Sequence, residues 1–121
     1  MPYTHANGKI CYLEIPSTNI PVSSEFYRKI FDWNIRRDNS GRVSFDDAIG
    51  EVSGMWTLDR KASREPGIVI SIMVDSVADT LQKIVENGGE IVRPIGADFP
   101  EITAHFRDPS GNVLALYQEL S

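Results

Sequence analysis

The pattern of hydrophobic and polar positions predicts a strand, a helix and three more strands in the first half of the chain. Apolar and polar residues alternate over residues 10–15, as in a strand, and Pro16 ends this segment. From Val22 onward apolar residues recur at helical spacing, and Asn19 precedes them as a candidate cap. The three further strands are predicted around residues 33–35, 43–47 and 51–59.

The second half of the chain repeats this order. Residues 68–74 predict a buried strand, and a helix begins after Ser76, which forms a capping-box-like pair with Asp79. Asn87, Gly88 and Gly89 end the helix, since glycine tolerates the left-handed conformation that follows a helix. The remaining strands are predicted over residues 90–92, 102–107 and 113–118, with the turn 108–112 between the last two.

The two halves overlay with matching apolar phase at a spacing of about 60 residues, which indicates an internal duplication. We therefore expect an α+β domain made of two βαβββ modules, at about 8–59 and 68–119, joined by a charged linker over 60–67. Each module would leave one face of its sheet uncovered, so we expect the two to associate.

The amino-acid composition limits which classes of partner and which cellular compartment are expected. Among 121 residues, 12 Lys and Arg stand against 17 Asp and Glu, a net charge of −5, which argues against nucleic-acid binding and weakly favours a cationic ligand. The single cysteine, Cys11, cannot form an internal disulfide, which fits the cytoplasm. No secretion signal is predicted in the N-terminal segment. No membrane span is predicted, because the longest apolar stretch, 68–74, is too short to cross a bilayer.

Several segments in this order resemble the glyoxalase / bleomycin-resistance / extradiol-dioxygenase superfamily, whose fold is called the vicinal oxygen chelate fold. The segments are Leu13-Glu14-Ile15-Pro16, Glu25-Phe26-Tyr27 through Phe31-Asp32-Trp33, Gly88-Gly89 with Arg93-Pro94, and Phe106-Arg107-Asp108-Pro109-Ser110-Gly111-Asn112. The resemblance spans nearly the whole chain and is strongest to the glyoxalase-like branch. It implies a cupped mixed sheet with helices on its convex side and a ligand in the cup.

The resemblance also implies a metal site in the catalytic members, where His, Gln or Glu on the first and last strand of each module bind one divalent ion. The matching positions here are Ile10 (or Tyr12 in a shifted register), Gly54, Val69 and Ala115. Ile, Gly, Val and Ala side chains carry no donor atom for a transition metal. The sequence thus predicts a protein with no metal and no other cofactor.

Two residues are candidates for proton transfer. Strand alternation directs Glu14 into the cup, where its carboxylate could take a proton or meet a cationic ligand, although a rim position or an arginine partner is an equally ordinary role. His105 precedes the turn at Asp108, and either it or Phe106 faces the cup. Cys11 is expected on the helix-facing side as a buried structural thiol.

The predicted ligand-binding wall is partly aromatic. Its members are Tyr12, Glu14, Trp56, Ser71, Met73 and Tyr117, with Met55 in place of Trp56 if that strand shifts by one residue. Aromatic walls with polar ends suit a flat or partly apolar ligand, although ordinary packing explains them as well.

These features favour a cytoplasmic, homodimeric protein that binds a small organic molecule in its cup without the metal of the superfamily. It would sequester the ligand or carry out proton transfer with Glu14 and His105. One alternative is a metal-dependent lyase, isomerase or dioxygenase with displaced ligands among Glu14, Glu51 and His105. Another is a scaffold module that binds no small molecule.

Overall fold

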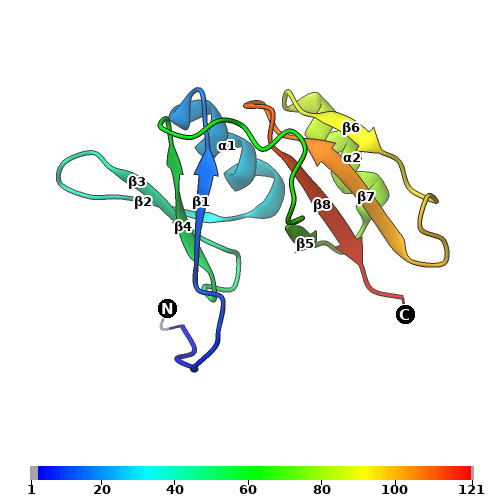
Figure 1. Cartoon of the computed structure of the whole chain (residues 1–121), viewed down its shortest axis with the longest axis horizontal. Coiled ribbons are helices and arrows are strands. Elements are labelled where there is room, and N and C mark those ends of the chain that lie inside the picture. Colours follow the sequence, from blue (N-terminus) through cyan, green and yellow to red (C-terminus); the bar gives the residue numbers. More distant parts are fainter. Residues whose placement is uncertain (1–2, 121) are drawn as a thin grey trace. The chain divides into compact units, whose positions relative to one another are not determined.

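The computed structural model describes residues 3–120 and divides the chain into two compact units, Met1–Lys61 and Ala62–Ser121, which we call the first and second module. The first contains β1 (Tyr12–Pro16), α1 (Ile20–Phe31), β2 (Asn34–Arg37), β3 (Val43–Asp46) and β4 (Ser53–Thr57) (Figure 1). The second contains β5 (Ser71–Met73), α2 (Val77–Glu86), β6 (Glu90–Arg93), β7 (Ile102–Arg107) and β8 (Val113–Gln118). The predicted α+β fold of two βαβββ modules is confirmed.

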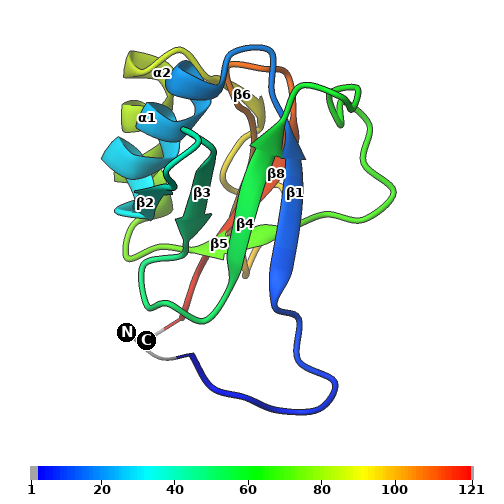
Figure 2. The ribbon, with the colours of Figure 1, turned by 90° about the vertical axis from the view of Figure 1, so that its left-hand side faces the viewer.

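The two sheets have the same topology. The strand order is β1-β4-β3-β2 in the first module and β5-β8-β7-β6 in the second. In each sheet the first strand pairs in parallel with the last, and the other neighbours are antiparallel. Figure 2 shows β1, β4 and β3 side by side in the first module, with α1 next to β2 and β3. This equivalence supports the duplication inferred from the apolar phase.

Helix α1 begins directly after Asn19, the residue predicted to cap it. The side chain of Asn19 accepts a hydrogen bond from the backbone N–H of Val22 at 3.1 Å. The buried face differs from the predicted stripe, because Val22 is 46% exposed and Ser23 is buried in its place. Burial of the Ser23 hydroxyl is tolerated because it lies 2.7 Å from the hydroxyl of Ser17.

Helix α2 also begins at its predicted cap. The hydroxyl of Ser76 accepts a hydrogen bond from the backbone N–H of Asp79 at 3.1 Å. Val77, Leu81 and Ile84 are buried against the sheet, whereas Val85 is exposed on the outer side of the helix. Within residues 3–120, neither helix has the length and hydrophobicity required to cross a membrane.

An aromatic cluster forms the core of the first module between α1 and the sheet. Trp33 lies 4.6 Å from Tyr27 and 4.5 Å from Phe45, measured between ring centroids. Trp56 lies 4.7 Å from Phe45 in the same way. These rings meet closely because Gly54 has no side chain, and a Cβ there would lie 2.3 Å from Phe45.

The first strand of each module is shorter than predicted. β1 begins at Tyr12 and β5 at Ser71, so Ile10 and Val69 lie before the strands and are exposed. The prediction that Cys11 is a buried thiol is wrong. Cys11 also precedes β1 and is exposed, because strand alternation begins only after it.

A buried polar network holds the turn before β8. The carboxylate of Asp108 accepts hydrogen bonds from the backbone N–H groups of Ser110 and Asn112 and from the Asn112 side chain. The side-chain oxygen of Asn112 in turn accepts the N–H of Ser63 at 2.8 Å, and the carbonyl of Ser63 accepts the N–H of Val113. The Asp108-Asn112 motif therefore fixes Ser63, near the start of the second module, against the turn before β8.

Candidate functional site

Each helix covers one face of its own sheet, and the opposite face carries the predicted site residues with the exception of Trp56. We call the face opposite α1 the uncovered face of the first module. Cross-strand register and alternation place these residues on it: Tyr12, Glu14, Asn34, Arg36, Ser44, Asp46, Ser53, Met55 and Thr57. Tyr12 and Glu14 thus share a face, as the alternation predicted.

Glu14 has an arginine partner. Its Oε1 accepts a hydrogen bond from Nη2 of Arg60 at 3.2 Å, and the Glu14 side chain is 48% exposed. The paired, partly solvated arrangement is the ordinary role foreseen for this residue. Arg60 follows β4 and extends back to β1, so a charged pair lies beside Tyr12 on the uncovered face.

The prediction that Trp56 shares a face with Tyr12 is wrong. Trp56 is 1% exposed and packs on Tyr27, Trp33 and Phe45, beneath α1. The register explains this placement, because Trp56 pairs with buried Ile15, whereas Met55 pairs with Glu14. Met55, the alternative considered for a one-residue shift, therefore lies on the uncovered face.

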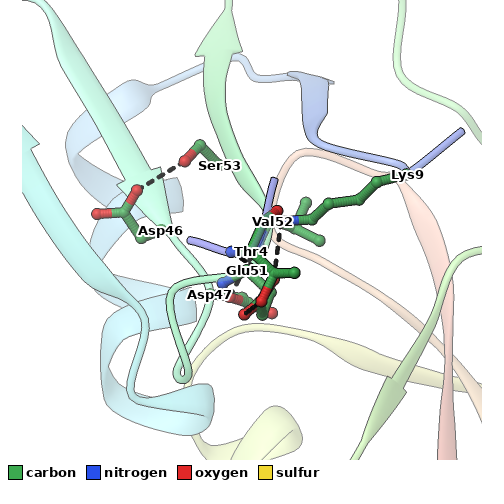
Figure 3. Close-up of polar contacts among 7 residues, drawn as sticks. All are labelled: Thr4, Lys9, Asp46, Asp47, Glu51, Val52 and Ser53. Atoms are coloured by element: carbon green, nitrogen blue, oxygen red, sulfur yellow. Dashed lines mark hydrogen bonds and ion pairs between the residues drawn. The ribbon is translucent and has the colours of Figure 1, made fainter. Parts of the chain in front are cut away.

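The sequence analysis missed a charged network on this face. Asp46 accepts hydrogen bonds from Arg36 Nε at 2.9 Å and Nη2 at 3.0 Å, from Ser53 at 2.7 Å and from Asn34 at 3.2 Å (the Ser53 bond appears in Figure 3). The hydrogen bonds from Arg36, then those from Ser53 and Asn34, lower the pKa of Asp46 despite partial burial. Only the strand register, which brings residues from β2, β3 and β4 together, reveals this network.

Asp46 should therefore stabilise the protein in a pH-dependent way. Because its folded-state pKa is lowered, the stabilisation is present above the ordinary aspartate pKa of 3.8 and is lost as the pH falls through the folded-state value. We expect Asp46→Asn to lower the free energy of unfolding by on the order of 1 kcal/mol at neutral pH. This figure is discounted because Arg36 is partly exposed. Urea unfolding from neutral to acidic pH measures it. Exposed Asp59→Asn is the control, and a difference from wild type that is equal at all pH values would contradict the assignment.

The corresponding uncovered face of the second module carries the other predicted residues. Ser71 and Met73 are exposed on β5, and Met73 pairs with Tyr117. The cross-strand register adds these residues to the same face: Glu90, Arg93, Thr103, His105, Arg107, Val113 and Ala115. Leu114 and Leu116 are buried on the helix side of the same strand.

The structure decides which of His105 and Phe106 points away from the helix. Phe106 is fully buried and pairs with Leu114, whereas His105 pairs with Ala115 on the uncovered face. Nearby, Asp98 accepts hydrogen bonds from Thr103 at 2.6 Å and from Arg93. The Thr103 hydrogen bond and the charges of Arg93 and His105 lower the pKa of Asp98.

Glu51, a candidate for a displaced metal ligand, has a structural role in the first module. Its carboxylate accepts hydrogen bonds from Lys9 Nζ at 2.8 Å and from the Thr4 hydroxyl at 2.8 Å (Figure 3). These bonds, that from Lys9 first, lower the pKa of Glu51. They join the N-terminal segment to the turn between β3 and β4.

The residues present do not fit the metal of the catalytic relatives. Among residues 3–120, no three His, Cys, Asp or Glu side chains come together as a group that could hold a metal ion. At the aligned positions, Gly54 lies on the helix side and Ala115 offers only a methyl group. Tyr12 and Met73 extend from the first strands of the modules without supplying an imidazole or carboxylate.

The comparisons with known proteins agree with this architecture. The family model for the Glyoxalase/Bleomycin resistance protein/Dioxygenase superfamily matches residues 9–116. The chain therefore belongs to this superfamily, as the sequence motifs indicated. No curated protein matches its sequence.

Solved structures share the fold at low sequence identity. The hypothetical protein SA1046 from S. aureus is 17% identical, with a TM-score of 0.73, over 95% of this chain and 96% of that one. The fosfomycin resistance protein FosX from Mesorhizobium loti is 11% identical, with a TM-score of 0.70, over 96% and 95%. TnmS3, an antibiotic binding protein from Streptomyces sp. CB03234, is 20% identical, with a TM-score of 0.68, over 97% and 100%.

Proposed function

We propose that this protein binds a small organic molecule on the uncovered sheet faces and does so without the metal of the catalytic relatives. The observation that carries the proposal is the set of large and polar side chains left exposed there. Tyr12 is 50% exposed and Met73 is 65% exposed, although both lie on sheet strands. Such side chains on an open sheet face are suited to contact a ligand.

The contacts of Glu14 favour binding over proton transfer. Arg60 already engages one oxygen of Glu14, so the carboxylate offers a charged contact to a ligand rather than a free base. The similar structures include an antibiotic binding protein and a fosfomycin resistance protein. Sequestration of an organic molecule therefore fits the site better than the proton-transfer role considered for Glu14 and His105.

Ligand binding should raise the melting temperature, because a molecule that binds only the native state stabilises it. We expect a thermal-shift screen of organic compounds, with metal salts as a separate arm, to find a stabilising compound whose affinity falls roughly tenfold in Glu14→Gln and in Tyr117→Ala. The measurement is calorimetric titration, with exposed Asp59→Asn as the matched control. Unchanged affinity in both variants would discard the site.

Other outcomes of the same screen distinguish the alternatives. Stabilisation by a transition metal at one equivalent, reversed by a chelator, would favour a lyase, isomerase or dioxygenase with displaced ligands. A screen without any stabilising compound would favour a scaffold module. We further propose a cytoplasmic homodimer, in keeping with the single cysteine, and a monomer mass in analytical ultracentrifugation would contradict the dimer.

A further inference from the structure

The uncovered face of the second module contains an arginine whose donors are not all used. Arg107 lies on β7, two residues from His105, so the two side chains share one face and their Cα atoms lie about 6.6 Å apart along the strand. Its side chain is 30% exposed, yet its Nε atom is buried. Among residues 3–120 this Nε–H has no hydrogen-bond partner.

The ion pair of Arg107 leaves one edge of the guanidinium open. Glu90 Oε2 lies 3.7 Å from Nη1, beyond hydrogen-bond distance, and the Glu90 side chain is 69% exposed. The Nε–Nη2 edge lies in the same plane, on the side away from the Glu90 contact, and carboxylates and phosphate-like groups bind an arginine edge of this kind with two parallel hydrogen bonds. Arg107 thus has a charged partner in Glu90 but retains an unused pair of donors.

The neighbours of Arg107 strengthen this site. Its cross-strand partner Val113 and the adjacent Ala115 are apolar and buried, so they offer Arg107 no acceptor atom and shield that side of the guanidinium from water. A buried donor without a partner is rare in native proteins and lowers stability by about 1–3 kcal/mol. Arg93, by contrast, already donates to Asp98, which also accepts from Thr103.

We propose that Arg107 binds an oxyanion, a carboxylate or a phosphonate, of the ligand, with His105 beside it as a second polar contact. This inference rests on the proposed small-molecule function and names the ligand class for the second module. It departs from the weak preference for a cationic ligand that the net charge of −5 predicts. The local donor arrangement decides the sign of a bound group, because surface charges farther away than about 10 Å are largely screened.

The test follows the arginine Nε–Hε signals of the full chain by NMR during titration with phenylphosphonate, benzoate, inorganic phosphate or neutral benzamide. We expect the anions, and not benzamide, to shift the Arg107 signal. Stronger binding of benzoate than of phenylphosphonate would identify a carboxylate ligand, and the reverse order a phosphonate. Arg107→Lys keeps the charge but loses the paired donors, so we expect roughly tenfold weaker binding.

Two further variants make the result specific. Arg42→Lys alters an exposed arginine of the first module and should leave the affinity unchanged. Glu90→Gln removes the competing carboxylate without touching Arg107, and we expect about threefold tighter binding. Equal shifts at all arginines, or a bound water at Nε with no response to any anion, would overturn the inference.

The outcome also separates this inference from the proposed function. If compounds from the thermal-shift screen bind through Glu14 and Tyr117 but no anion affects Arg107, the oxyanion site is wrong and the binding function stands. If anions bind at Arg107 while Glu14→Gln and Tyr117→Ala have no effect on any compound, the oxyanion site stands and the wider site is wrong.

Discussion

Replacing Trp56 with alanine is expected to lower the free energy of unfolding by about 3–5 kcal/mol. The side chain is 1% exposed and is surrounded by Tyr27, Trp33 and Phe45, so its removal leaves a large cavity beneath α1. Chemical denaturation monitored by circular dichroism measures this loss. The expected size of the effect depends on the helix-side position of Trp56, in contrast to the ligand-facing position that the sequence predicted.

Two matched variants test that position directly. Met55→Ala changes the neighbouring residue on the same strand, which points to the uncovered face, and should lose only about 1 kcal/mol. Trp56→Phe keeps an aromatic ring and removes the indole N–H, for which no acceptor exists among residues 3–120. We therefore expect Trp56→Phe to retain most of the free energy of unfolding. A larger loss in Met55→Ala than in Trp56→Ala would reverse the assignment of the two faces.

The fold could be predicted well because its signals are local. The caps at Asn19 and Ser76 act within one helical turn, and the turn at 108–112 lies between two strands of alternating residues. These features, together with the repeat of apolar phase, were enough to predict two βαβββ modules. The strands at 102–107 and 113–118 have the predicted bounds.

It was harder to predict which residues of a strand face the helix where two consecutive residues are both large and apolar. In β8, the sequence Leu-Ala-Leu alternates in size, and the two large residues, Leu114 and Leu116, are the ones that face the helix. In β4, Met55 and Trp56 are both apolar, so alternation alone does not choose between them. Only the pairing of Trp56 with Ile15 decides it, and that pairing joins strands about 40 residues apart in the chain.

The site could be predicted only in part for a related reason. Tyr12, Glu14 and His105 lie on uncovered faces, but their partners come from distant segments. Glu14 meets Arg60, 46 residues away, and Asp46 meets Arg36 across a hairpin. Charged residues spaced this way along the sequence resemble an ordinary solvated surface until the register brings them together.

Gly54 should tolerate no side chain, and Gly54→Ala is expected to lower the free energy of unfolding by about 3 kcal/mol. A Cβ at this position would lie 2.3 Å from Phe45 Cζ and 2.4 Å from the backbone oxygen of Leu13 on the paired strand. The backbone of β1 cannot move away without breaking its parallel pairing with β4. Gly67→Ala is the matched control, because nothing lies within 4 Å of a Cβ there, and it should change stability by less than about 0.5 kcal/mol. Equal stability of the two variants in urea unfolding would contradict the close approach of these strands. The same contacts place Gly54 on the helix side of β4, so the position that the sequence analysis assigned to a metal ligand does not face the cup.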